Sequence, residues 1–334
     1  MNILLASSRS KTIGLGHFSR MLALRNSLAK SGDFHPYFSV LGDHDHVLGV
    51  NSNNIDADLV AELSLDYFQL VSDFVEVNHV KLLIMDFHKS TKGPELLKFL
   101  KWARAKGIVL VAVDSLIDYQ EHLDHIWMPS VHFDLSKVSN KKGFCDVSFG
   151  WDHFLLARSE AIPNWQAGGS VLVMTGGADV LGLASWLPEL LDTKLVSSST
   201  VNWVKGPYSN SPYIPISPKL NWKLHDNPKD IDKLICESNY VLTLFGVSFF
   251  ESIQYGVPTV TVPLDRYETG LELDLIQREK VALAADDIEE AVNCLVQLMG
   301  DDILAKKLSE TSKSKMSING CDLFLSKINQ LINQ

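Results

Sequence analysis

The sequence predicts an α/β protein with two domains, each built on a doubly wound parallel sheet. Short apolar runs alternate with helical patterns almost from end to end, as in a sheet covered by helices on both faces. The 334 residues exceed the size at which one hydrophobic core stops growing. Residues 161–169 lack periodicity, which indicates a linker. We therefore expect domains at 1–160 and 170–315, and a C-terminal helix in 316–334 that packs back on the first domain or forms a dimer contact.

The first domain is expected to hold five strands and at least two helices. The apolar runs predict strands at 2–6, 37–41, 82–85, 108–113 and 126–128. A helix at 18–30 would carry Phe18, Met21, Leu24 and Leu28 on one face. Ser31-Gly32 would end it, and Lys106-Gly107 would end a second helix at 94–105, because glycine readily adopts the left-handed backbone of a helix end.

The second domain shows the same alternation. Its apolar runs predict strands at 171–174, 201–205, 240–244 and 259–262. Helical patterns lie at 230–237, 250–255, 287–299 and 303–317, and the C-terminal helix that follows the domain is expected at 321–333. No internal repeat or low-complexity tract interrupts the series.

Composition restricts the class of partner. The formal net charge of −10 argues against a nucleic acid or an anionic membrane, because both attract basic surfaces. The four cysteines are widely spaced, without a metal-ligand pattern, which predicts free thiols in a reducing compartment. No basic leader and no apolar stretch of about 20 residues is present, so the expectation is a cytoplasmic protein without a transmembrane segment that acts on a small molecule.

The first candidate motif is Ile13-Gly14-Leu15-Gly16-His17, between the first strand and the first helix. Two glycines let the backbone turn sharply near a ligand, and a helix N-terminus favours phosphate or a developing oxyanion. Histidine transfers protons near neutral pH, so His17 is a candidate base, with a solvated or capping histidine as the alternative. A third glycine is missing, which weakens a dinucleotide-binding interpretation.

Other polar or glycine-rich corners follow the remaining strands, at the ends where open parallel sheets bind ligands. Gly176, Gly177 and Gly246 could offer amides to a diphosphate, and Glu251 could accept hydrogen bonds from a ribose diol or complement the helix dipole. The corners are Asp86-Phe87-His88, Asp114-Ser115, Thr175-Gly176-Gly177-Ala178-Asp179, Phe245-Gly246-Val247-Ser248 with Glu251, and Pro263-Leu264-Asp265-Arg266-Tyr267-Glu268.

These motifs resemble the pseudaminic-acid-pathway UDP-sugar hydrolases and, more distantly, the UDP-N-acetylglucosamine transferase that forms lipid II. The resemblance runs in consistent order from about residue 1 to about residue 325, on segments 13–20, 113–114, 149–158, 171–179, 246–251, 255–258 and 319–320. It implies the GT-B fold, two Rossmann-like domains facing across a cleft. It also implies that His17 acts on the attacking water, that the carboxy-terminal corners hold UDP, and that Glu251 binds the ribose.

The sequence departs from that family mainly on the sugar side. Ser8 stands where the family has an aspartate, Ser115 replaces the second residue of an aspartate pair, and His88 replaces a tyrosine. Tyr267-Glu268 aligns with an Asn-Gln pair. The identity of the sugar, and with it the reaction, is therefore open, whereas the nucleotide half matches better.

The resulting hypothesis is an inverting hydrolase of a UDP-activated amino or deoxy sugar, in bacterial surface-glycan or nonulosonic-acid biosynthesis, with His17 as the base that activates water. His17, Asp86 and Asp114 would be catalytic, and no metal or cofactor is expected, because amides and helix dipoles would hold the nucleotide. The alternatives are a GT-B glycosyltransferase with a UDP or CMP donor and a sugar hydroxyl acceptor, or a non-catalytic nucleotide-sugar-binding protein. The residues assigned to substrate binding are Gly14, Gly16, Arg20, His88, Ser115, Gly176, Gly177, Asp179, Gly246, Val247, Ser248, Glu251, Tyr267 and Glu268.

Two further histidine clusters have a simpler interpretation. Asp43-His44-Asp45-His46 is more typical of a polar loop than of a metal site, because ligand type without geometry is weak evidence. His122 and His125 flank Asp124 beside a predicted strand, and a solvated or structural role is expected for them.

Overall fold

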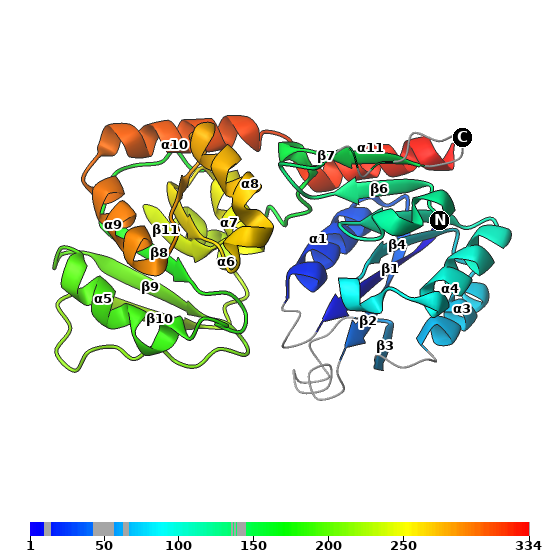
Figure 1. Cartoon of the computed structure of the whole chain (residues 1–334), viewed down its shortest axis with the longest axis horizontal. Coiled ribbons are helices and arrows are strands. Elements are labelled where there is room, and N and C mark those ends of the chain that lie inside the picture. The colour runs from blue at the N-terminus through cyan, green and yellow to red at the C-terminus, as the bar shows by residue number, and fades with distance from the viewer. Residues whose placement is uncertain are drawn as a thin grey trace. The chain divides into compact units, whose positions relative to one another are not determined.

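The computed structural model describes residues 1–9, 15–42, 57–62, 67–134, 136, 138 and 145–333. The chain divides into two compact units. The first comprises Met1–Leu156 and Ile318–Gln334, and the second comprises Ala157–Ser317. The last helix thus belongs to the first unit although it follows the second along the chain (Figure 1).

The first unit is built on a seven-stranded sheet in the order β3-β2-β1-β4-β5-β6-β7. Every neighbouring pair is parallel. The strands are β1 (Asn2–Arg9), β2 (His35–Gly42), β3 (Leu59–Glu62), β4 (Leu82–Asp86), β5 (Val109–Val113), β6 (His125–Met128) and β7 (Asp146–Phe149). All five residues of β4 are buried, as expected for a strand covered on both faces.

Helices cover both faces of this sheet. On one face α3 (Tyr67–Val77) and α4 (Pro94–Ala105) bury an apolar layer against the strands. On the other lie α1 (Gly16–Ser31) and α11 (Gly320–Ile332), whose Phe324 and Ile328 join the same buried cluster as Met21 of α1. A Cβ on Gly320 would collide with the Phe154 carbonyl oxygen, so only glycine lets α11 begin this close to the backbone at Phe154.

The second unit has a six-stranded parallel sheet in the order β10-β9-β8-β11-β12-β13. Its strands are β8 (Ser170–Met174), β9 (Thr200–Lys205), β10 (Asn221–Asp226), β11 (Tyr240–Leu244), β12 (Thr259–Val262) and β13 (Leu283–Ala284). One face packs on α5 (Leu187–Lys194), α9 (Ile288–Met299) and α10 (Asp302–Lys315). On the other, Ile235 of α6 (Ile231–Cys236) and Tyr255, which ends α7 (Val247–Gln254), pack on Leu172 and Val241. Helix α8 (Arg266–Arg278) precedes β13.

The predicted strands are all present, and the differences lie in short or exposed elements. Strands β3, β7, β10 and β13 were not predicted, nor were α3, α5 and α8. Strand β10 carries half-exposed and exposed residues along its length, so it lacks the apolar run that identifies a buried strand. Helix α7 begins at Val247, not at 250 as the periodicity suggested, which puts Ser248 in its first turn. None of the described helices combines the length and apolar character needed to cross a membrane.

Candidate active site

The first candidate site lies where the strand order of the first sheet reverses. Strands β1 and β4 are neighbours, yet the chain leaves β1 toward β2 and leaves β4 toward β5. Such a switch point opens a crevice beyond the carboxyl ends of the two strands, which is where open α/β sheets bind ligands. Helix α1 begins just after β1 and carries His17, and Asp86 is the last residue of β4.

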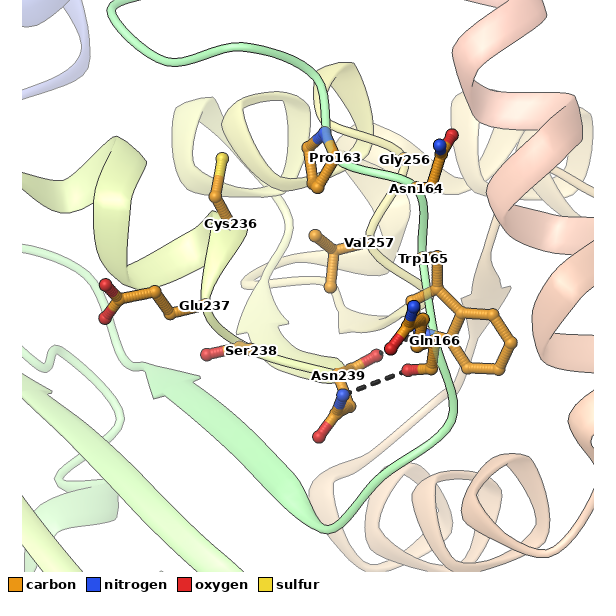
Figure 2. A pocket seen from close by; sticks show the side chains of 10 residues that line it. All are labelled: Pro163, Asn164, Trp165, Gln166, Cys236, Glu237, Ser238, Asn239, Gly256 and Val257. Carbon is orange, nitrogen blue, oxygen red and sulfur yellow. Dashed lines mark hydrogen bonds between the residues drawn. The ribbon is translucent and has the colours of Figure 1, made fainter.

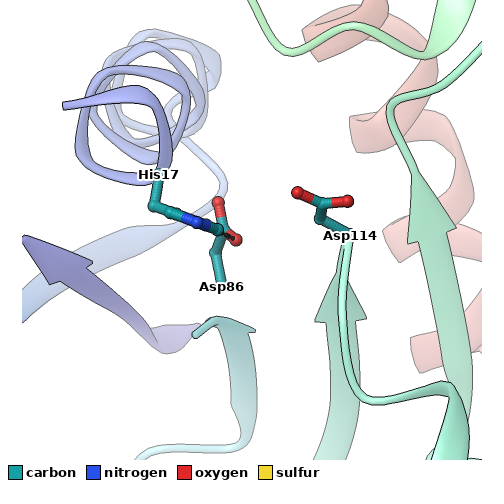
Figure 3. A group of neighbouring side chains, drawn as sticks. All are labelled: His17, Asp86 and Asp114. Atoms are coloured by element: carbon teal, nitrogen blue, oxygen red, sulfur yellow. Dashed lines mark hydrogen bonds and ion pairs between the residues drawn. The ribbon is translucent and has the colours of Figure 1, made fainter. Parts of the chain in front are cut away.

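Three side chains converge there on Arg20 (Figure 3 shows His17, Asp86 and Asp114). Arg20 donates two hydrogen bonds to Asp86, from Nε to Oδ2 at 2.5 Å and from Nη2 to Oδ1 at 2.7 Å. Nη2 also donates to Asp114 Oδ2 at 2.6 Å. The His17 Nδ1 lies 2.7 Å from Asp86 Oδ1. The Asp86 side chain is 0% exposed, against 16% for His17 and 40% for Asp114. Asp86 is therefore the buried member of the group, and His17 and Asp114 are the members that a ligand can reach.

Counting hydrogens fixes the tautomer of His17. The Arg20 Nη2 carries two hydrogens, and Asp86 and Asp114 accept them. Nη2 also lies 2.8 Å from His17 Nδ1, but it has no third hydrogen to donate there. Nδ1 must carry its own hydrogen and donate it to Asp86, an acceptor when ionised. The other ring nitrogen, Nε2, then holds a free lone pair, which is the state of a general base.

The charges of this cluster support one another. Burial alone would raise the pKa of Asp86, but Arg20 and His17 outweigh it and hold that pKa below its ordinary value. Burial likewise works against the charge of Arg20, and Asp86 and Asp114 more than offset it, so the pKa of Arg20 rises. Asp86 therefore stays an anion and can stabilise the imidazolium that forms when His17 accepts a proton.

Within the described residues, His17, Asp86 and Asp114 also form a group whose ligand atoms lie within 4.8 Å of one another, as a cation site requires. Arg20 Nη2 lies 2.6 to 2.8 Å from all three of those atoms. The guanidinium thus stands where a shared cation would bind and already supplies its charge. The residues present do not fit a metal ion.

Asp114 reaches Arg20 through a strained turn. Its φ is 68°, in the left-handed region that a non-glycine residue rarely adopts. The Ser115 amide donates to the Val113 carbonyl across it at 2.8 Å, and the Asp114 amide donates to Trp127 at 2.8 Å. Strain of this kind persists only where the surroundings enforce it, and it concentrates at functional sites. Asp86 at the end of β4 and Asp114 just after β5 thus accept hydrogen bonds from the same guanidinium, that of Arg20.

The remaining residues predicted for the first unit lie around this cluster. The Ser115 hydroxyl donates to the Phe87 carbonyl at 2.6 Å, and the Ser8 hydroxyl accepts from the His88 amide at 3.3 Å, so both serines hold the corner after β4. The His88 ring lies edge-on to His17, with centroids 6.1 Å apart. Gly16 opens α1, whereas Gly14 lies outside the described residues.

The second unit has its own switch point, between β8 and β11. Gly176 and Gly177 follow β8, and Gly246 follows β11 and directly precedes α7. Gly176 has a φ of 84° and Gly246 a φ of 153°, values that favour glycine. The first amides of α7, from Val247 onward, have no helical carbonyl to pair with and can face an anion.

Gly206, which the sequence analysis missed, holds the Gly-Gly corner in place. A Cβ there would lie 2.5 Å from the Gly176 carbonyl oxygen and 2.6 Å from that of Gly177. The loop after β9 fastens to the same corner, because the Tyr208 amide donates to the Gly177 carbonyl at 2.9 Å. Asp179 accepts from the amides of Leu183 and Ala184 at 3.0 and 2.9 Å, so both of its carboxylate oxygens cap a short helix.

Glu251 lies in the second turn of α7 and is half-buried. Burial and the negative charge of Asp232 raise the pKa of Glu251 to about 7, against a smaller lowering by a hydrogen bond from Ser248. Within the part of the chain that the structure describes, no Lys or Arg forms an ion pair with this carboxylate. Hydroxyl donors from a ligand could supply that stabilisation.

The other predicted residues either lie outside the described part of the chain or make the following contacts. The 43–46 segment lies outside the described residues, as do the side chains of Tyr267 and Glu268. The Nε2 of His122 lies 3.2 Å from Oε1 of Glu121, and the Asp124 carboxylate accepts a hydrogen bond from the Leu110 amide at 2.7 Å. His125 is buried, and that burial lowers its pKa to about 3. Asp124 thus has a structural role at the start of β5.

A pocket of about 170 Å³ lies at the opposite end of the second sheet (Figure 2). It sits beside the starts of β11 and β12, not their carboxyl ends. Its lining is Pro163, Asn164, Trp165, Gln166, Cys236, Glu237, Ser238, Asn239, Gly256 and Val257. Asn239 donates to the Gln166 carbonyl at 2.9 Å and Trp165 donates to the Asn239 carbonyl at 2.7 Å, so these residues fasten the 161–169 segment to the sheet.

Solved structures match the chain over nearly its whole length. UGT2 of Phytolacca americana, complexed with UDP-2fluoro-glucose and pterostilbene, aligns with a TM-score of 0.64 at 14% identity and 99% coverage of both chains. MurG of Acinetobacter baumannii aligns at 0.61 and 15% identity, covering 98% of this chain and 99% of its own. The chain has the GT-B fold. The glycosyltransferase SnogD of Streptomyces nogalater aligns at 0.61 and 14% identity, with 99% coverage of both chains.

At these identities the likeness shows the fold alone. No protein-family model and no curated protein matches the sequence. The GT-B expectation is thus confirmed. The resemblance to the UDP-sugar hydrolases is carried only by the sequence motifs, because the solved structures named here are glycosyltransferases.

Proposed function

We propose that the protein is an inverting glycosyltransferase that takes a sugar from a nucleotide-activated donor and passes it to an acceptor hydroxyl. The observation that carries this proposal is the His17–Asp86 pair at the switch point of the first sheet. Asp86 is fully buried and accepts the Nδ1 hydrogen of His17 at 2.7 Å, which leaves Nε2 as a base. The GT-B fold supports the same class of reaction.

In the proposed reaction the Nε2 of His17 takes the proton of the acceptor hydroxyl. The acceptor oxygen attacks the anomeric carbon from the face opposite the diphosphate, so a new C–O bond forms as the bond to the phosphate oxygen breaks. The diphosphate leaves with the electron pair, and the protonated His17 later releases its proton to water. Asp86 stabilises the imidazolium throughout, and Arg20 keeps Asp86 ionised.

The second unit would bind the nucleotide. The amides at Gly176, Gly177 and the start of α7 suit the diphosphate, because helix N-termini attract phosphate groups. Glu251 would accept hydrogen bonds from the ribose hydroxyls. Amides and a helix dipole would stabilise the leaving diphosphate without a metal ion.

Hydrolysis is the second candidate, favoured by the motifs shared with the UDP-sugar hydrolases, from Gly16-His17 to Gly246 and Glu251. Water would then replace the acceptor hydroxyl at the same base. The two reactions differ in one measurable respect, which is whether the donor turns over rapidly when no acceptor is present.

The test is a panel of UDP-linked and CMP-linked sugars, incubated without acceptor and then with a mixture of glycosides and alcohols. NMR would follow free sugar, released nucleotide and new glycosides. We expect slow release alone and faster release with an acceptor, and His17→Gln should abolish turnover while UDP binding by calorimetry persists. His132→Gln, at an exposed histidine, is the matched control. Rapid release of free sugar without acceptor would instead establish the hydrolase.

A further inference from the structure

His88 is the second histidine of the site and is held in a defined way. It lies two residues beyond the end of β4. Its ring caps a short helix at Lys89–Thr91, where the Ser90 amide donates to the ring Nδ1 at 3.3 Å. The Ser90 hydroxyl lies 2.9 Å from the same nitrogen. Both contacts of Nδ1 are thus with Ser90.

These contacts assign the tautomer of His88. A backbone N–H can only donate, so the Nδ1 of His88 must accept and carries no hydrogen in the neutral ring. The hydrogen is therefore on Nε2. Burial, His17 and Lys89 lower the pKa of His88, which keeps the ring neutral at physiological pH. His88 and His17 thus have opposite tautomers: His17 offers a lone pair at Nε2, and His88 offers an N–H there.

The two rings are close enough to share one ligand atom. Their centroids are 6.1 Å apart, with an interplanar angle of 82°. A hydrogen bond to oxygen spans about 2.8 Å, and this spacing of the rings allows one oxygen to reach the Nε2 atoms of both. Such an oxygen would give its hydrogen to His17 and accept one from His88.

We propose that His88 is a catalytic residue whose Nε2–H donates to the attacking oxygen while His17 accepts that oxygen's proton. This inference rests on the proposed function and deepens it. As the proton moves to His17, negative charge grows on the oxygen and the hydrogen bond from His88 strengthens, so His88 stabilises the transition state more than the bound substrate. No proton leaves His88, and the charge balance is that of the displacement described above.

The pair also selects the class of acceptor. The attacking atom must donate one hydrogen and accept another at the same time. A neutral hydroxyl does both, whereas an alkylammonium ion has no lone pair to accept with. The geometry therefore fits alcohol, phenol or sugar hydroxyl acceptors and disfavours protonated amines.

The first test reads the tautomers directly and needs no substrate. Long-range ¹H–¹⁵N correlation spectra of the ¹⁵N-histidine-labelled full chain, assigned with His17→Gln and His88→Gln, distinguish the two tautomers of each ring. We expect the hydrogen on Nδ1 of His17 and on Nε2 of His88. Finding both rings in the same tautomer would overturn the proposal whatever reaction the protein catalyses.

The second test separates donation from packing. His88→Gln keeps an N–H near the Nε2 position, whereas His88→Leu keeps bulk and loses the donor. Since losing one such donor lowers kcat by roughly 10²- to 10³-fold, we expect that loss in His88→Leu, with partial recovery in His88→Gln and little change in KM for the donor. Equal loss in both variants would refute donation by His88.

The same two tests distinguish failure of this inference from failure of the proposed function. If the wild-type chain releases no nucleotide from any donor, with or without acceptor, the proposed function fails. If wild-type turnover depends on His17 but His88→Leu retains full kcat, only the role of His88 is overturned.

Discussion

Replacing Glu251 with glutamine should make the protein more stable at high pH and weaker at binding a nucleotide. Burial and Asp232 raise the pKa of Glu251 to about 7 from an ordinary 4.5. Between those values the carboxyl ionises in the unfolded chain before it does so in the folded one. The folded state is therefore favoured below about pH 4.5, and this advantage is lost as pH rises to about 7.

The size of the effect follows from the shift. One pKa unit corresponds to about 1.4 kcal/mol, so a rise from 4.5 to about 7 gives an upper bound of about 3.5 kcal/mol. Glu251 is only half-buried, and screening by water reduces the expected gain to about 1 to 3 kcal/mol. Glutamine cannot ionise and keeps nearly the same shape, so Glu251→Gln should gain this stability at pH 8 and almost nothing at pH 4.5.

The assay is urea unfolding of the wild type and the variant at pH 4.5, 6 and 8, with Glu237→Gln as the control at an exposed glutamate of the same unit. UDP affinity is measured by calorimetry over the pH values at which both proteins stay folded. The wild type should bind more tightly as Glu251 ionises, and the variant should bind more weakly. Taking the difference between the two removes the titration of UDP itself.

Two results would refute this reasoning. If Glu251→Gln gains no stability at pH 8, the carboxyl does not ionise at an energetic cost in the folded protein. If the variant gains stability and binds UDP as well as the wild type does, Glu251 is buried for packing alone. A gain in stability with a loss of affinity is the pattern expected of a residue kept for function.

Two further predictions concern the frame of each corner. Asp86→Asn should lower kcat by about 10⁴-fold. The asparagine amide can donate to Nδ1 of His17, and the ring hydrogen would then move to Nε2, where the base is needed. An unchanged kcat in a folded variant would contradict the role of Asp86. Gly206→Ala should weaken UDP binding, since its Cβ would press on two backbone carbonyl oxygens, whereas Gly169→Ala meets only ordinary contacts and should bind normally. Equal UDP affinities by calorimetry would show that the Gly176 corner tolerates displacement.

The sheets could be predicted from sequence because their strands are buried on both faces. A parallel strand buried on both faces is mainly apolar, as at residues 82–85 and 240–242, and such runs stand out between helical patterns. Edge strands lack this constraint. Asn221–Asp226 faces solvent along most of its length and pairs with one neighbour, β9, so its residues carry no such signal. The start of α7 was placed late because Val247 and Ser248 follow a glycine and show no helical periodicity.

The candidate site could be predicted in part, because parallel strands bring their carboxyl ends to one edge. This principle predicts that His17, Asp86 and Asp114 lie close together, and they do. The role of Arg20 could not be read from spacing. It depends on partners 66 and 94 residues away in the chain and on the turn at Asp114, whose φ of 68° no local pattern signals. Gly206 was missed for a similar reason, since only the folded backbone reveals what its Cβ would meet.

The charge balance around His17 explains why a guanidinium suits this site. Two carboxylates and one guanidinium leave a net charge of −1 beside the ring of His17, and this charge would stabilise the positive charge that the ring gains in the proposed reaction. Without Arg20, two neighbouring carboxylates would compete for a proton, and a protonated Asp86 could no longer fix the tautomer of His17. A metal ion would screen the carboxylates too, but it would also bind the imidazole lone pair. An arginine that cannot lose its proton keeps Asp86 ionised and leaves Nε2 of His17 free to act as the base.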